Sequence, residues 1–228
     1  LPHLSNFTDC TAFEMHPDVK VEYYRNQRDL QLANPDLLVI PGSKNTIDDT
    51  CHVINSKMSD EIHRLHDCGV PIVGICGGYQ LLGKEIKDPF QVESTRGSIE
   101  GLGLLNIVTT IEEEKRTVRT SGKVQGNFMG MELADMKVEG YEIHMGTSEA
   151  LDNAKPFAIL EDGTVDRVIA EDGTVMGTHL HGIFDNDGLR EKIIEALRVK
   201  KNLEAGPTAF DFKAFKEEQY DLLAETVE

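Results

Sequence analysis

Basic side chains are scarce in this sequence. Its 228 residues include 23 Lys and Arg against 40 Asp and Glu, which gives a formal net charge of -17 when histidines are counted as neutral. Proteins that bind nucleic acid phosphates or anionic membrane surfaces need clustered Lys and Arg side chains. The acidic balance therefore argues against nucleic acid and against a membrane as partners.

Long apolar runs are absent as well. The uncharged stretch at residues 69–83 has only 15 residues, five of them glycines, whereas a membrane-spanning helix needs about 20 apolar residues. The first four residues, Leu-Pro-His-Leu, contain neither the basic region nor the apolar core of a secretory signal. With 39% hydrophobic and 28% charged residues, the composition is that of a globular protein.

Cysteines are few and widely spaced. Cys10, Cys51, Cys68 and Cys76 form no close Cys-x-x-Cys pair and are too sparse for a disulfide scaffold. We therefore expect reduced thiols in a cytoplasmic protein, one of them reactive. The chain has no initiator Met and opens with strand-like residues, which predicts that it is part of a longer protein.

The first half of the chain alternates strand and helix patterns. Residues 36–40 and 71–75 are short apolar runs of the kind found in parallel strands buried on both faces. Residues 19–24 are predicted to form a further short strand, residues 43–68 favour helix, and residues 80–87 predict a short helix. This alternation is typical of parallel strands joined by helices.

Strand patterns dominate the second half. The predicted strands cover residues 101–111, 116–128, 138–145, 157–160, 164–170 and 175–180, and the predicted helices cover residues 189–200 and 212–226. No repeat or linker divides the chain. We expect a single α/β domain over residues 1–228, with an open, largely parallel central sheet flanked by helices and with additional antiparallel strands.

The sequence Gly74-Ile75-Cys76-Gly77-Gly78 follows an apolar strand and precedes a predicted helix. This is the context of a nucleophile elbow, with Cys in place of Ser. Small neighbours are needed because the sharp turn holds the nucleophile in a strained backbone conformation. We expect an ionised and accessible sulfur at the carboxyl edge of the sheet, and the alternative is a buried structural Cys beside a Gly-rich turn.

Two histidines provide candidate proton carriers. His179 and His181 end a predicted strand and share a face if that strand is regular, so the pattern does not choose between them. Each has a structural, hydrogen-bonded role as its alternative. Pro41-Gly42-Ser43 ends another strand, and its backbone N–H groups are placed to face the elbow across a sheet crevice, unless the segment is an ordinary turn.

Other chemistry is less well supported by spacing. His52, His63 and His66, with Cys51 and Cys68, match no zinc pattern, so we expect no metal site. The Gly42-Ser43-Lys44 segment lacks the first glycine of a Walker A motif, because position 38 is Leu.

Several blocks occur in an order that resembles a known family. Residues 41–46, 74–83, 140–146 and 178–182, together with the opening Leu-Pro-His-Leu-Ser-Asn-Phe-Thr-Asp, are similar to the glutamine amidotransferase domains of cobyric acid synthases, in the triad-type class I amidotransferase superfamily. The resemblance covers nearly the whole chain. The elbow alone is generic for such enzymes, and the opening segment and the Tyr-Glu-Ile-His block make the resemblance more specific.

The resemblance implies a role for each matching residue. Cys76 is implied as the nucleophile and His181, directly before Gly182, as the general base and acid. The resemblance also implies four residues that form the oxyanion hole or bind the substrate: Gly42, Ser43, Gly77 and Gln80.

The group that orients the catalytic histidine stays open. The wider triad class places Glu two residues after its His, and here that position is Ile183. Glu142, His144 and Asp185 are the candidates for an orienting or accessory role, and spacing establishes none of them. His179 stands where the resemblance predicts an aromatic residue.

The implied activity is hydrolysis of glutamine to glutamate and ammonia through a cysteine thioester. The implied partner is an ATP-dependent synthetase domain of the same synthase, which is absent from this chain and amidates corrin side-chain carboxylates in cobalamin biosynthesis. ATP and Mg are expected only in that domain, and this domain is expected to need no cofactor. The alternatives are the amidotransferase domain of another synthetase (cobyrinic acid a,c-diamide or cell-wall precursor amidation), a non-catalytic regulatory partner domain, and a cysteine hydrolase acting on another small molecule.

Overall fold

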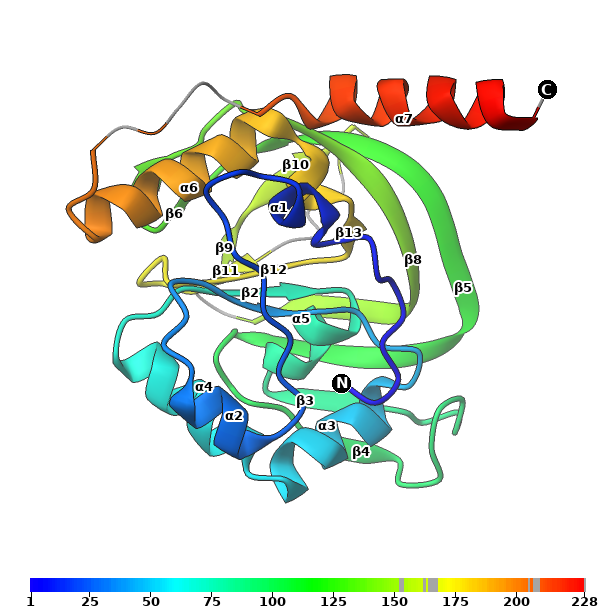
Figure 1. The fold of residues 1–228 in the computed structure, drawn as a ribbon. Helices are drawn as coiled ribbons and strands as arrows, with labels where there is room; N and C mark the ends of the chain where they lie inside the picture. Colours follow the sequence, from blue (N-terminus) through cyan, green and yellow to red (C-terminus); the bar gives the residue numbers. More distant parts are fainter. Residues whose placement is uncertain (152–153, 162, 164–167, 205, 207–209, 228) are drawn as a thin grey trace.

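The computed structural model describes residues 1–151, 154–161, 163, 168–204, 206 and 210–227 (Figure 1). One five-stranded sheet has the order β1-β2-β12-β11-β9. Its strands are β1 (Leu38–Ile40), β2 (Ile72–Ile75), β12 (Val175–Thr178), β11 (Val168–Ile169) and β9 (Lys155–Pro156). β1, β2 and β12 are parallel, whereas β11 and β9 are antiparallel to their neighbours.

A second sheet has the order β13-β8-β5-β3-β4, with β10 paired to β5. Its strands are β13 (Leu180–His181), β8 (Lys137–Ala150), β5 (Ile107–Val124), β3 (Glu85–Lys87), β4 (Ser98–Glu100) and β10 (Ala158–Leu160), and β6 (Asn127–Phe128) with β7 (Met131–Glu132) forms a separate hairpin. The long β5 and β8 run together along one side of the molecule (Figure 1). β13 follows β12 after one residue, so the two sheets meet beside the end of β12.

Seven α-helices and one 3-10 helix are described. They are α1 (Thr11–Glu14), α2 (Gln27–Leu32), α3 (Thr46–Asn55), α4 (Met58–Asp67), α5 (Gly77–Leu82), the 3-10 helix η1 (Ile183–Asp185), α6 (Asp187–Lys200) and α7 (Phe212–Val227). In Figure 1, α1 and α6 lie on one side of the sheet, and α2, α3 and α4 lie on the other. Among the described residues, no helix combines the length and the apolar character that crossing a membrane requires.

The alternation of side chains along the strands divides the core in two. On one face, Val73, Ile75 and Met176 pack with Phe13 of α1 and Ile193 of α6. On the other face, Ile72 and Val175 pack with Leu30 of α2, Val53 of α3 and Leu65 of α4. Strands buried on both faces explain why the sequence shows continuous apolar runs there.

The α/β class, with parallel strands and additional antiparallel ones, is confirmed. Two local predictions are wrong. Residues 19–24 form no strand, because no other strand pairs with this segment among the described residues. Its alternation arises instead from Val19 and Val21, which pack against the core. The helix predicted at residues 80–87 has the wrong bounds. The observed helix α5 ends at Leu82, Gly83 is extended, and residues 85–87 form β3. The predicted strand at 164–170 lies partly outside the described residues, and 168–169 form β11.

Gly78 marks the closest approach between two neighbouring turns of the first sheet. A Cβ atom at this position would overlap the carbonyl oxygen of Ile40 and lie 2.8 Å from the carbonyl oxygen of Pro41. Backbone atoms cannot move aside as a flexible side chain can, so the junction between β1 and α5 requires glycine here.

We predict that Gly78→Ala lowers the free energy of unfolding by about 3 kcal/mol or more, because its methyl group meets backbone oxygen. Gly188→Ala in α6 is the matched control: its Cβ would lie 3.9 Å from Met136 Sδ, an ordinary contact, and the change is expected to be neutral or to stabilise by about 0.4–1 kcal/mol. Urea unfolding followed by circular dichroism measures both, and equal stability of the two variants would contradict the packing argument.

Candidate active site

Cys76 occupies the turn between β2 and α5. Its φ of 52° and ψ of -112° place a non-glycine residue in a rarely populated backbone region, at a cost of about 1–3 kcal/mol. The turn is tight on all sides, since a Cβ on Gly74 would lie 2.7 Å from the carbonyl oxygen of Gly78, and one on Gly77 would lie 2.8 Å from Ser43 N. The geometry is that of a nucleophile elbow, as the sequence predicted.

The turn after β1 lies against this elbow. A Cβ built on Gly42 would lie 3.1 Å from His181 Cε1 and 3.5 Å from Cys76 Cβ. The N-terminal segment pairs with the same turn, because Ser5 N–H donates to the Gly42 carbonyl at 3.0 Å and Lys44 N–H donates to the His3 carbonyl at 2.8 Å. Three segments far apart in sequence thus meet around Gly42.

His181 lies on β13 with only 2% of its surface exposed, and it contacts a carboxylate that is equally buried. Its Nδ1 donates to Asp9 Oδ2 at 2.8 Å, and the other carboxylate oxygen of Asp9 accepts from Gly182 N–H at 3.1 Å. Asn6 Nδ2 also donates to Asp9 Oδ1 at 2.8 Å. Three hydrogen-bond donors therefore hold the Asp9 carboxylate in one orientation.

These contacts change the protonation of His181. Burial alone would lower the pKa of His181, but the hydrogen bonds to Asp9 and Cys76 and the charge of Asp9 raise it to about 10. Because Nδ1 is committed to Asp9, Nε2 is the nitrogen left to face Cys76. His181 is therefore an imidazolium at neutral pH, beside the sulfur.

His179 has a different environment. It is fully buried, its Nε2 hydrogen-bonds Ser148 Oγ at 3.2 Å, and its ring stacks on His144 at 3.9 Å between centroids. The edge of the ring meets Tyr79 at 5.0 Å. His179 is thus part of a packed aromatic cluster, while His181 contacts the cysteine.

The three residues proposed to orient His181 form hydrogen bonds with other partners. Glu142 is buried and accepts a hydrogen bond from Arg116 Nε at 2.8 Å. His144 Nδ1 donates to the Gly146 carbonyl at 2.9 Å, and burial lowers its pKa. Asp185 accepts from Lys216 Nζ at 3.2 Å. The carboxylate bonded to His181 is that of Asp9, which the sequence analysis did not single out.

No local sequence feature identifies Asp9 as a site residue. It lies 172 positions before His181 in the chain, in an irregular segment with no helical or strand periodicity. The only sequence signal is the opening segment of the family resemblance, which contains Ser5, Asn6 and Asp9 but assigns them no role. Asn6 also donates to Tyr141 Oη at 2.8 Å, and the Tyr141 ring stacks on His181.

Ser43 and Gln80 are held by neighbouring side chains. Ser43 Oγ donates to the fully buried Asp49 at 2.7 Å and accepts from Asn45 N–H. Gln80 accepts from Thr46 Oγ1 at 3.0 Å and donates from Nε2 to the Met145 carbonyl at 3.2 Å. Gln80 lies one helical turn after Cys76, and its part in substrate binding stays a prediction.

The sulfur is less accessible than the sequence suggested. Cys76 is only 5% exposed, and its thiol donates to the Ile143 carbonyl of β8 at 3.4 Å. The expectation of an open sulfur at the sheet edge is wrong for this closed arrangement, because β8 crosses in front of the elbow.

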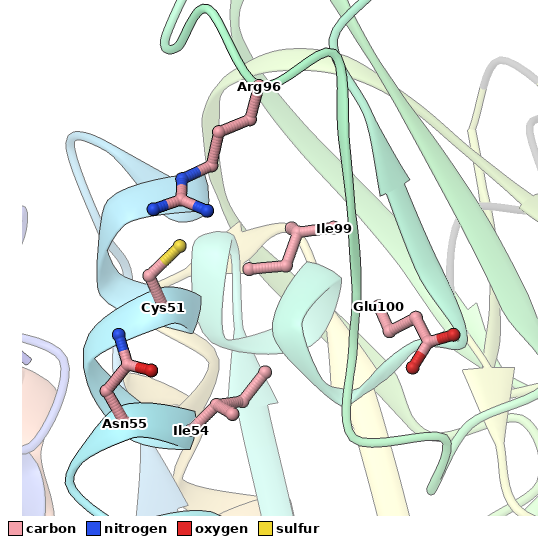
Figure 2. A pocket seen from close by; sticks show the side chains of 6 residues that line it. All are labelled: Cys51, Ile54, Asn55, Arg96, Ile99 and Glu100. Carbon is pink, nitrogen blue, oxygen red and sulfur yellow. The ribbon is translucent and has the colours of Figure 1, made fainter.

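Other polar clusters lie apart from this site. His63, one of the histidines weighed as a metal ligand, hydrogen-bonds the Ser59 and Leu102 carbonyls through its two ring nitrogens. A cavity of about 340 Å³ between α3 and β4 shares no lining residue with the Cys76 site (Figure 2). It is lined by Cys51, Ile54, Asn55, Arg96, Ile99 and Glu100.

Comparison with known proteins bears on this geometry. A family model described as the CobB/CobQ-like glutamine amidotransferase domain matches residues 1–189. The chain belongs to this family. The matched range of the amidotransferase domain includes Asp9, Gly42, Cys76 and His181.

Curated relatives are similar over the whole chain. Cobyric acid synthase of Thermoanaerobacter sp. is 41% identical over 235 residues, which cover 100% of this chain and 46% of that protein. Cobyric acid synthase of Clostridium botulinum is 44% identical over 237 residues, which cover 100% of this chain and 45% of that protein. The amidotransferase domain therefore spans about half the length of the curated relatives it matches.

Solved structures share the fold of the amidotransferase domain. The structure of PurLQS from Thermotoga maritima matches with a TM-score of 0.63 and 18% identity, over 87% of this chain and 94% of that one. A solved glutamine amidotransferase matches with a TM-score of 0.60 and 18% identity, over 85% and 95% of the two chains.

The raised pKa of His181 predicts a pH-dependent stability. Its folded-state pKa of about 10 lies above the ordinary value of 6.5, so the stabilisation is complete below about pH 6.5 and is lost as the pH rises to about 10. We predict that the difference in unfolding free energy between wild type and His181→Asn shrinks over this range, measured by urea unfolding at several pH values. In an Asp9→Asn background the dependence should weaken, and a difference that stays constant from pH 6 to 10 would contradict the assignment.

Proposed function

We propose that this chain hydrolyses glutamine to glutamate and ammonia through a thioester on Cys76. We also propose that the ammonia supplies an ATP-dependent synthetase that amidates corrin side-chain carboxylates in cobalamin biosynthesis. The observation that carries the first half is the contact between Cys76 at the elbow and a His181 held by Asp9. Similarity to cobyric acid synthases over the whole chain supports the second half.

The first step is attack on the substrate amide. His181 Nε2 already holds the proton given up by Cys76, so the reacting pair is a thiolate beside an imidazolium. The thiolate forms a C–S bond to the side-chain carbonyl carbon of glutamine. The carbonyl oxygen gains the negative charge. The backbone N–H groups of Gly42 and Gly77 are the proposed donors to this oxyanion, since Gly77 directly follows Cys76 in the elbow and the turn at Gly42 lies against it.

The remaining steps need a single proton carrier. The C–N bond breaks as His181 gives its proton to the leaving ammonia, which leaves a γ-glutamyl thioester. His181 then takes a proton from water, whose oxygen attacks the thioester carbon, and the C–S bond breaks to release glutamate. Asp9 holds the ring in one orientation and stabilises the imidazolium through both halves of the cycle.

The length of the relatives supports a partner domain. Since they are about twice as long as this chain, we propose that residues 1–228 are an amidotransferase domain and that ATP and Mg act in a separate synthetase domain. A cytoplasmic location fits the four free cysteines. An amidotransferase of another synthetase is the closest alternative, and the assembled Cys76–His181 pair disfavours a purely regulatory domain.

We predict that diazo-oxo-norleucine, an electrophilic glutamine analogue, labels Cys76. Burial, with the charges of Asp9 and Glu14, raises the pKa of Cys10 to about 12, so Cys10 should be unreactive. Within the part of the chain that the structure describes, neither Cys51 nor Cys68 has a hydrogen bond to a histidine. Mass spectrometry locates the label. The labelled chain, mixed with an ATP-dependent corrin synthetase half, should lose glutamine-dependent amidation but keep ammonia-dependent amidation. Labelling at Cys51 or Cys68 instead would refute the assigned nucleophile.

Asp9→Asn is expected to lower kcat for glutamine by about 100-fold or more, because the orienting charge is lost. The raised pKa of His181 depends on Asp9, so the alkaline pH at which activity declines should also move down in the variant. Asp185→Asn is the matched control and should stay within about threefold of wild type. An Asp9→Asn enzyme with an unshifted pH profile, or an equal loss in Asp185→Asn, would argue against this role.

A further inference from the structure

Ser5 has a backbone fixed by its neighbours. Leu4 forms an antiparallel bridge with Ser43, and Ser5 N–H donates to the Gly42 carbonyl at 3.0 Å. Asp49 reinforces the same contact, because it accepts from His3 N–H at 3.2 Å and from Ser43 Oγ at 2.7 Å. The direction of the Ser5 side chain is therefore set by a paired backbone.

The Ser5 hydroxyl is buried and has no hydrogen-bond partner among the described residues. A buried polar group left unsatisfied costs about 1–3 kcal/mol, whereas alanine would fill nearly the same space without this cost. Such a group calls for an explanation, and a polar ligand or a buried water is the usual one.

The position of the hydroxyl favours a ligand. A Cβ built on Gly42 would overlap Ser5 Oγ, and the same point lies 3.1 Å from His181 Cε1 and 3.5 Å from Cys76 Cβ. The hydroxyl, the imidazole and the cysteine thus all lie close to the same point beside the Gly42 backbone. Asn6 and Asp9, which follow in the same segment, hold His181.

We propose that Ser5 Oγ is a substrate-contacting group that donates a hydrogen bond to the oxygen of the reacting carboxamide, as a third donor beside the Gly42 and Gly77 N–H groups. This inference rests on the proposed function. The oxygen is the chosen partner because Ser5 lies against Gly42. As negative charge develops on that oxygen, a donor already fixed in place stabilises it without reorganisation.

Ser5→Ala tests the role. We expect kcat for glutamine hydrolysis to fall by about 10- to 100-fold, somewhat less than is typical when one of two oxyanion donors is removed, with KM within about twofold. Iodoacetamide alkylation of Cys76 forms no oxyanion, so its rate and pH dependence should not change. Ser5→Thr keeps the hydroxyl and should recover part of kcat. Ser56→Ala is the matched control, because Ser56 Oγ, at the end of α3, donates to the Val53 carbonyl and has no other hydrogen bond among the described residues.

Several results would overturn the proposal. Normal kcat in Ser5→Ala would mean that a buried water satisfies the hydroxyl, and a parallel loss of kcat and alkylation rate would mean that Ser5 only positions Cys76 or His181. Failure of the proposed function looks different, because wild type itself would then show neither glutamine turnover nor labelling of Cys76 by diazo-oxo-norleucine.

Discussion

The close approach between the elbow and the turn after β1 is the constraint on which the site depends. Cys76 holds an unfavourable backbone conformation, and such strain persists only where the surroundings over-determine it. Gly77 and Gly78 supply that constraint, because they let the elbow touch Ser43, Ile40 and Pro41 without intervening side chains. The same contact brings Gly42 to the sulfur, so one packing requirement positions both the nucleophile and the backbone proposed to stabilise the oxyanion.

The Asp9–His181 pair adds an electrostatic constraint. Burying two charges is costly, and a buried pair is stable only when the remaining polar atoms are satisfied. Here Gly182 N–H and Asn6 Nδ2 complete the bonding of the Asp9 carboxylate. The N-terminal segment is therefore part of the site, and its loss would leave an imidazolium without its counter-charge.

Local features of the fold and the site were predictable from the sequence, whereas contacts across the chain were not. The strands around Ile40 and Ile75 and the elbow at Cys76 are encoded within a few residues, by apolar runs and small neighbours. Spacing alone did not choose between His179 and His181, and only the family resemblance implied His181. The contact of His181 with Asp9 depends on the path of an irregular segment, which no local pattern predicts. Residues 19–24 show that a local pattern can also mislead, because an alternating segment forms no strand when no neighbouring strand pairs with it.

Triads are recognised by geometry and by the role of each group, not by the order of residues in the chain. The position two residues after His181 is Ile183, which is fully buried in the core beside Phe184. A carboxylate there would meet an apolar environment, at a high cost in desolvation. The orienting role can be taken by any carboxylate that reaches His181 Nδ1 and whose oxygens accept further hydrogen bonds. Asp9 in the opening segment meets this condition. The same segment runs along the Gly42 turn, so a change that displaced it would remove the counter-charge of His181 and loosen the oxyanion backbone together.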